Sequence, residues 1–265
     1  MKVSKLPSIL ATSVALAFAS MSAAWGADLE MLQPGKLQVA TEGTYPPFSM
    51  QSPDGKLDGL EIRVAKEVAR RLNVEYVPVV IKWESILIGL MSDQYDMISA
   101  AMDITPERQK QVTFANGWLE SGGRVVTKVN SPIKSGADIK GKTVGALVAS
   151  TWTKLAEERG AKEVKTYKAE SDALQDLVNG NIDAVITDSI AAAYAIKTSK
   201  LPLTMTEDYV SQVQKGFPFK KGKPNLVKAV NKAIEDMIAD GTYARLTTEL
   251  VGYSPAPKQP IQTQF

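Results

Sequence analysis

Hydrophobic and polar residues follow two periodicities along the first half of the chain, one typical of strands and one typical of helices. Short apolar runs at 37–41, 74–81 and 95–102 have the length of β-strands. Between them, apolar residues recur at every fourth position over 60–72, and 83–91 also places its apolar side chains at helical spacing. The pattern therefore predicts the order strand, helix, strand, helix, strand, which is typical of an α/β sheet with crossover helices.

The same rhythm restarts in the second half of the chain. Predicted strands and helices alternate there, with strands at 142–147, 164–167 and 182–187 and helices at 152–159, 171–178 and 190–197. Two further amphipathic helices are expected over 226–237 and 243–250. The chain thus contains two α/β units, and the ligands of such sheets bind beyond the carboxyl ends of the strands.

Two predicted loops occupy that kind of position. The first, 42–48, follows a strand and contains adjacent prolines, which forbid regular structure. In the second, Thr105 is a good N-cap and Pro106 suits the first position of a helix. Arg108 can then present its planar fork of donors to a carboxylate, and Asp103 can accept from a cation. Spacing alone leaves open that Arg108 is a solvated first-turn residue and Asp103 a turn former.

The first 26 residues form a separate unit with the pattern of a secretory signal peptide. Lys2 and Lys5 precede an uncharged apolar run over 9–19, and small residues lead to a predicted cleavage site after Gly26. A membrane anchor is the alternative, but the apolar run is well short of the ~20 residues that a spanning helix needs. We therefore expect an exported protein.

Composition narrows the chemistry of the exported chain. Of 265 residues, 44% are hydrophobic and 23% charged, as in ordinary globular proteins. The 31 basic residues less the two signal-peptide lysines leave 29, equal to the 29 acidic residues, and no basic run indicates a nucleic acid partner. Cysteine and histidine are both absent, which excludes disulfides, a lipid-modified cysteine and the usual catalytic triads. We expect a periplasmic protein with no metal and no cofactor.

Seven short motifs carry a resemblance that covers about 37–252. They are Ala40-Thr41-Glu42-Gly43-Thr44-Tyr45-Pro46-Pro47-Phe48, Asp58-Gly59-Leu60-Glu61-Ile62, Trp83-Glu84-Ser85-Ile86, Asp103-Ile104-Thr105-Pro106-Glu107-Arg108, Gly141-Lys142-Thr143-Val144-Gly145, Asn181-Ile182-Asp183-Ala184-Val185 with Asp188, and Asp240-Gly241-Thr242-Tyr243. In this order and spacing the chain resembles the polar-amino-acid family of periplasmic solute-binding proteins, the receptors of ATP-driven importers.

The resemblance implies a fold and a domain organisation. We expect an α/β protein with the two-lobed type II periplasmic-binding-protein fold, in which each lobe is a mixed sheet flanked by helices and two hinge strands join the lobes. Lobe 1 would combine 27–120 with 215–253, and lobe 2 would be 121–214. The Pro- and Gln-rich segment 254–265 is expected to be a flexible tail.

The resemblance also implies a ligand site in the cleft between the lobes. Arg108 would clamp the α-carboxylate of an amino acid, Asp188 would hold its α-ammonium from the other lobe, and Thr151 would cap the carboxylate. Tyr45 and Trp83 would sandwich the aliphatic part of the ligand. The full predicted set is Glu42, Tyr45, Trp83, Ala101, Asp103, Arg108, Ser150, Thr151 and Asp188.

Three alternatives to these roles stay open. Tyr45 and Trp83 could be core residues. Asp188 could merely cap the helix that follows it. Ala149 stands where relatives often have glycine, so the backbone of the loop before Ser150 is not fixed by the resemblance.

Charge suggests the class of ligand. If Glu42, Asp103 and Asp188 face the cleft against Arg108 alone, the site carries a formal charge of about −2, which burial disfavours unless the ligand compensates. We therefore expect a polar and basic L-amino acid such as arginine, lysine or ornithine. Cystine and glutamine are the alternatives, since the loop around Glu42 also resembles cystine-binding members.

As a receptor the protein would be a monomer that closes on its ligand and presents it to a membrane permease, without inserting into the membrane itself. An enzyme on the same scaffold is an alternative, because a periplasmic arogenate or prephenate dehydratase resembles this family; it would use a carboxyl group as general acid. A sensory module is the third possibility, which the absence of a spanning segment after Gly252 argues against.

Overall fold

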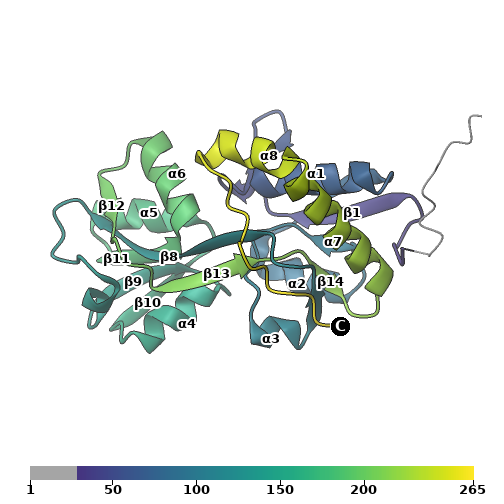
Figure 1. The fold of residues 1–265 in the computed structure, drawn as a ribbon. Coiled ribbons are helices and arrows are strands. Elements are labelled where there is room, and N and C mark those ends of the chain that lie inside the picture. The colour runs from purple at the N-terminus through teal and green to yellow at the C-terminus, as the bar shows by residue number, and fades with distance from the viewer. Residues whose placement is uncertain (1–28) are drawn as a thin grey trace, which may run out of the picture.

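The computed structural model of the protein describes residues 29–265, and in it the chain forms two lobes side by side (Figure 1). Each lobe contains a main β-sheet with helices packed against it. The two-lobed α/β fold expected from the sequence is confirmed. The predicted signal peptide, 1–26, lies outside the described residues. No helix in the described part of the chain is long and apolar enough to cross a membrane.

Lobe 1 is built around a five-stranded mixed sheet. In spatial order its strands are β5 (Glu75–Val80), β1 (Lys36–Thr41), β6 (Met97–Ile98), β14 (Pro218–Lys220) and β7 (Val112–Phe114). Strand β1 is parallel to both neighbours, whereas β14 is antiparallel to β6 and β7. Its helices are α1 (Leu60–Arg71), α2 (Trp83–Met91), α3 (Pro106–Gln109), α7 (Pro224–Ala239) and α8 (Thr242–Val251). A small sheet of β2 (Thr44–Tyr45), β3 (Ser49–Gln51) and β4 (Leu57–Asp58) covers one end.

Lobe 2 is built from the middle of the chain. Its sheet has the order β10 (Glu163–Tyr167), β9 (Thr143–Leu147), β11 (Ala184–Asp188), β8 (Leu119–Lys128) and β12 (Leu203–Met205). The helices are α4 (Thr151–Glu158), α5 (Glu170–Asn179) and α6 (Ser189–Ser199), with a short 3₁₀ turn, η1 (Gly136–Ile139). Strands β9, β10 and β11 are parallel, so their carboxyl ends share one edge of the sheet.

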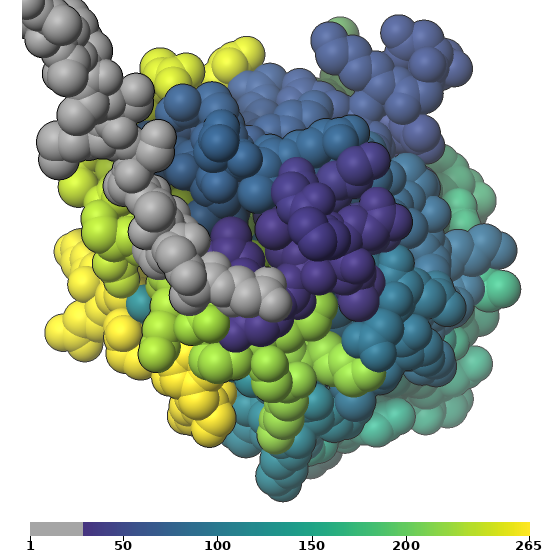
Figure 2. Space-filling view, turned by 90° about the vertical axis from the view of Figure 1, so that its right-hand side faces the viewer, coloured from purple at the N-terminus to yellow at the C-terminus, as the bar shows by residue number. Residues whose placement is uncertain are grey.

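Two antiparallel strands join the lobes. Strand β8 leaves lobe 1 and β13 (Ser211–Lys215) returns to it, and they pair in a register that runs from Ser211 opposite Gly123 to Lys215 opposite Leu119. Because β14 follows β13 directly and enters the sheet of lobe 1, that lobe contains residues from both ends of the described chain. Figure 2 shows these purple and yellow-green segments together on one face.

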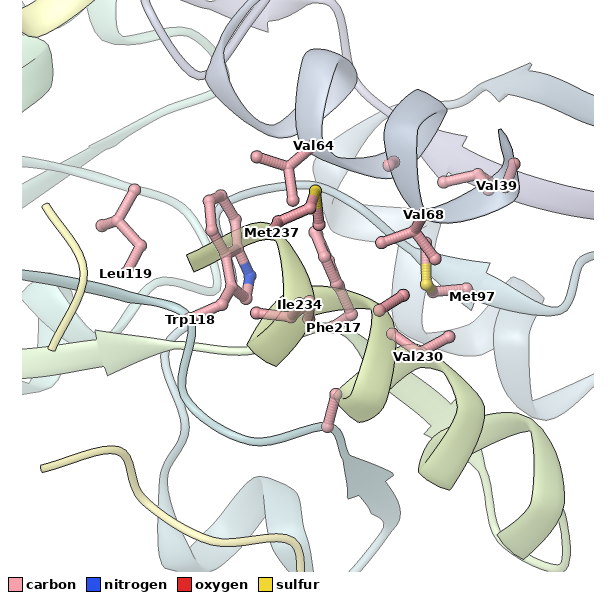
Figure 3. Packing of buried hydrophobic residues seen from close by; sticks show 14 of the residues in the cluster. Val39, Val64, Val68, Met97, Trp118, Leu119, Phe217, Val230, Ile234 and Met237 are labelled. Carbon is pink, nitrogen blue, oxygen red and sulfur yellow. The ribbon is translucent and has the colours of Figure 1, made fainter. Parts of the chain in front are cut away.

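The core of lobe 1 lies where α1 and α7 meet beside the start of the hinge. Val64 and Val68 of α1 face Val230 and Met237 of α7, with other apolar side chains between them (Figure 3). The ring of Trp118 lies in the same layer and is fully buried. Burial of such a side chain contributes about 1.5–3 kcal/mol to folding, and this packing fixes the lobe-1 end of β8.

The segment 254–265, expected from its composition to be a flexible tail, makes hydrogen bonds to the hinge. It lies along the two hinge strands (Figure 1), where Pro255 O accepts from the Glu120 amide and Ile261 O accepts from the Gly117 amide, both at 2.8 Å. The Ile261 amide donates to the side chain of Gln214 at 2.7 Å. Gly117 just before β8, Glu120 in β8 and Gln214 in β13 thus supply donors and acceptors that composition does not reveal, and the flexibility of the segment stays a prediction.

Candidate functional site

A cleft with an empty volume of about 380 Å³ lies between the lobes. It is lined by Glu42, Tyr45, Trp83, Ala100, Ala101, Asp103, Arg108, Leu147, Ser150, Thr151, Trp152 and Lys215. This set contains eight of the nine residues predicted from the sequence. The ninth, Asp188, is fully buried behind the cleft surface and is not part of its lining. Lys215 is a charged lining residue that the sequence did not predict.

Arg108 lies at the lobe-1 side of the cleft because a short helix begins as predicted. The backbone N–H of Arg108 donates to the hydroxyl of its N-cap, Thr105, at 3.2 Å, and Pro106 occupies the first turn. The guanidinium is half-buried and donates to two carbonyl oxygens, those of Asp103 at 3.0 Å and Ala149 at 3.5 Å. Within residues 29–265 it forms no ion pair, so its remaining N–H donors are available to an anion.

Helix α4 starts opposite Arg108, in lobe 2. Its N-cap, Ser150, makes no capping hydrogen bond and instead donates its hydroxyl to Leu147 O at 2.7 Å. The first amides of α4 are therefore available to an anion, which the positive end of the helix also favours. The preceding residue, Ala149, has a φ of 55°. Alanine thus adopts here the left-handed conformation that glycine takes more easily, which answers the question left by the sequence.

Two aromatic residues connect the lobes across the cleft. Trp83 donates its indole N–H to Val148 O in lobe 2 at 3.0 Å, and the guanidinium of Arg108 lies 5.5 Å from its ring. The hydroxyl of Tyr45 lies 3.3 Å from that of Thr187, also in lobe 2. Tyr45 belongs to the lobe-1 core and also lines the cleft, and its contact with a ligand stays a prediction.

Lys215 forms the other charged end of the cleft. Its ammonium nitrogen lies 2.7 Å from Asp103 Oδ1 and 3.0 Å from Asp188 Oδ2, and its side chain is 2% exposed. Although burial opposes ionisation, the two carboxylates raise the pKa of Lys215 well above its ordinary value. The second carboxylate oxygen of Asp103, Oδ2, accepts a hydrogen bond from the Thr151 hydroxyl at 2.6 Å.

Asp188 caps helix α6, as the alternative interpretation proposed. Its Oδ1 accepts from the Ile190 amide at 2.9 Å and from the Ser121 hydroxyl at 2.8 Å. Its Oδ2 is buried and has no hydrogen bond of good geometry in the described chain, although Lys215 lies close to it. Contact between Asp188 and a ligand ammonium stays a prediction.

These contacts correct the charge count made from the sequence. That count set three carboxylates against Arg108 alone, whereas the structure adds Lys215 as a second cation. The five groups together carry a formal charge of −1 rather than −2. Glu42 is the carboxylate that remains, and burial raises its pKa.

Two buried glutamates lie outside the cleft lining and accept hydrogen bonds from residues in it or next to it. Glu61 accepts from the amide of Ala101, a residue held at a φ of 47°, and burial raises the pKa of Glu61 to about 7. Glu170 accepts from the Thr187 hydroxyl, and burial together with the nearby charge of Asp188 raises its pKa to about 8. The described residues contain no cluster of three or more His, Cys, Asp or Glu side chains arranged to hold a metal ion.

Comparison with known proteins identifies relatives of the whole two-lobed chain. The model of the bacterial extracellular solute-binding proteins, family 3, matches residues 37–252. The L-cystine-binding protein TcyJ of Escherichia coli (strain K12) is 36% identical over 221 residues, which cover 82% of this chain and 83% of that protein.

Two solved structures are similar in fold as well as sequence. An ancestral arginine-binding protein bound to arginine has a TM-score of 0.75 and 36% identity, covering 82% of this chain and 98% of that one. The ancestral amino acid-binding protein AncCDT-1, a precursor of cyclohexadienyl dehydratase, has a TM-score of 0.76 and 32% identity, covering 82% and 96%. All three relatives are named as binding proteins.

Proposed function

Because this chain belongs to the bacterial extracellular solute-binding proteins, family 3, we propose that it is the periplasmic receptor of an amino acid importer of the ABC class. The chain binds its ligand in the cleft, is held closed by contacts from both lobes, and presents this closed form to a membrane permease. The names of the relatives support an amino acid as ligand and binding rather than catalysis as the activity.

The observation that carries this proposal is the pairing of Arg108 with the start of α4. A half-buried guanidinium without a carboxylate partner in the described chain lies opposite uncapped helix amides from the other lobe. An α-carboxylate would accept from both at once, so its binding would join the lobes. The same carboxylate would offset the cost of burying Arg108, since burial lowers the pKa of Arg108.

The side chain of the ligand would point toward Glu42. With Lys215 counted, Glu42 supplies the remaining negative charge, so a basic amino acid such as arginine, lysine or ornithine would neutralise the cleft. The similarity to an arginine-binding protein supports this choice. Cystine is the second candidate, on the strength of the similarity to TcyJ.

A calorimetric panel of arginine, lysine, ornithine, histidine, cystine, glutamine and glutamate tests the proposal. We expect arginine to bind tightest and glutamate weakest, because only glutamate adds to the negative charge of the cleft. Tighter binding of cystine would select the second candidate, and absence of binding by every member would contradict the receptor proposal. Incubation with prephenate and arogenate should leave both compounds unchanged; product formation would show an enzyme instead.

A further inference from the structure

Lys215 links acidic residues of both lobes from the hinge. Asp103 belongs to the turn before α3 in lobe 1, and Asp188 ends β11 in lobe 2. Lys215 ends the hinge strand β13, where its carbonyl accepts from the Trp118 amide at 3.0 Å. Its ammonium also lies 5.3 Å from the centre of the Phe48 ring. The backbone pairing and the aromatic ring hold this cation in place.

The position of this ammonium coincides with the one that the resemblance gives to the ligand. Asp188 is the residue expected to hold the α-ammonium of an amino acid, and its Oδ2 is the oxygen that Lys215 approaches at 3.0 Å. Lys215 is also a lining residue of the cleft, whereas the buried Asp188 is not. The chain itself therefore places a positive charge next to both carboxylates.

We propose that Lys215 is a specificity-determining residue that replaces the α-ammonium of the ligand, so that the cleft also accepts 2-hydroxy and 2-oxo acids carrying the side chain of its amino acid. This inference rests on the proposed function, because the carboxylate still binds at Arg108 and the side chain still points toward Glu42. What changes is the class of ligand, which widens from α-amino acids to α-substituted carboxylic acids.

The physical reason is that Asp103 and Asp188 keep a cationic partner when the ligand carries no ammonium group. A site that depends on a donor of its ligand rejects the analogue lacking that donor by about 10⁴-fold or more, since its own buried groups are left unpaired. Here Lys215 keeps Asp103 and Asp188 paired with either ligand. The loss of the amino group should therefore cost no more than about 100-fold in affinity, the value of a hydrogen bond made by a charged group.

Calorimetry with matched ligands tests this on the unmodified protein. Arginine is compared with 2-hydroxy-5-guanidinopentanoate, and cystine with its bis-2-hydroxy acid, while agmatine serves as the analogue without a carboxylate. We expect each hydroxy acid to bind within about 100-fold of its amino acid, and agmatine not to bind. If the amino acids bind and both hydroxy acids bind about 10⁴-fold more weakly, the proposed role of Lys215 is contradicted while the proposed function stands. Binding of neither class would overturn the proposed function and this inference with it.

Variants assign the effect to Lys215. In Lys215→Met the buried carboxylates need the ammonium of the ligand, so the affinity ratio of amino acid to hydroxy acid should rise at least 100-fold. The exposed neighbour variant Lys221→Met should keep the ratio of the unmodified protein. If Lys215→Met does not fold, the double variant Lys215→Met with Asp103→Asn removes one buried charge and should show the same rise. An unchanged ratio in a folded variant would contradict the inference.

Discussion

The two ends of the cleft each contain a cation, and the two cations differ in exposure and in the groups that they contact. Arg108 is half-buried and donates to carbonyl oxygens alone, whereas Lys215 is 2% exposed and contacts two carboxylates. The Arg108 end therefore needs an anion from outside, while at the Lys215 end one ammonium group offsets part of the charge of two carboxylates within the chain. The comparison indicates that ligand recognition is concentrated at the Arg108 end and that lobe closure is supported by the Lys215 end.

Removing Lys215 should have the largest effect on folding. Lys215→Met leaves Asp103 and Asp188 buried without their cation, and breaking a buried pair in this way costs about 3–5 kcal/mol. We expect that loss in the free energy of unfolding from urea titration. Lys220→Met, in the partly exposed pair with Asp93, should change it by about 1 kcal/mol or less. Equal losses for both variants would mean that the Lys215 end is not a closed ion-pair network.

Removing Arg108 should instead affect binding. Arg108→Ala takes away the guanidinium that would hold the carboxylate, so the affinity for amino acids should fall by about 2–4 kcal/mol, or 30- to 1,000-fold. The melting temperature of the free protein should change little, because Arg108 has no carboxylate partner in the described chain. Calorimetry and thermal unfolding measure the two effects, with the exposed Arg245→Ala as the control. Retained affinity would place the carboxylate elsewhere.

The sequence predicted the Arg108 end because that end is local. The N-cap, the proline and the arginine lie within four consecutive positions, and the turn residue Asp103 stands two positions before the N-cap. Tyr45 and Trp83 could also be predicted, because the motifs that carry the resemblance are short and local. The eight predicted residues that line the cleft all come from strand ends, loops or helix starts that a pattern can locate.

The Lys215 end could not be predicted because its partners are distant in sequence. Lys215 is 112 residues from Asp103, and an antiparallel backbone bridge between these two residues brings them together. Nothing in the run Gln212-Val213-Gln214-Lys215 distinguishes a buried lysine from a solvated one. The contacts of 254–265 with the hinge were missed for the same reason, since they depend on where the two lobes place β8 and β13.

Buried carboxyl groups make the Lys215 side of the molecule sensitive to pH. Glu170 accepts from Thr187 and lies near Asp188, and its pKa of about 8 exceeds the ordinary value of 4.5. Between these values the folded state keeps a proton that the unfolded state releases. The resulting stability is fully present below pH 4.5 and is lost as pH rises toward 8, at up to about 1.4 kcal/mol per pH unit.

Urea unfolding from pH 5 to pH 8 measures this loss. Glu170→Gln should flatten the profile, because the amide does not titrate and can still accept from the Thr187 hydroxyl. Some slope should persist from Glu61, whose pKa is about 7. The variant Glu163→Gln, at an exposed position of β10, should keep the slope of the unmodified protein. An unchanged slope in Glu170→Gln would show that this carboxyl is ionised when folded.

Glu42 should have the smallest effect, and it tests whether ligand charge matters between the two ends. Burial raises the pKa of Glu42, and hydrogen bonds from Thr44 and the Trp83 backbone oppose that shift, so the group stays available to a cation. A charge-assisted hydrogen bond exceeds a neutral one by about 1 kcal/mol. In calorimetry, Glu42→Gln should therefore lower the affinity for arginine about fivefold and leave the affinity for glutamine unchanged. The neighbouring Glu84→Gln removes a carboxylate outside the cleft lining and should alter neither affinity. An equal change for arginine and glutamine would mean that Glu42 does not contact the ligand's cationic group, and the choice of amino acid would then depend on the shape of the cleft.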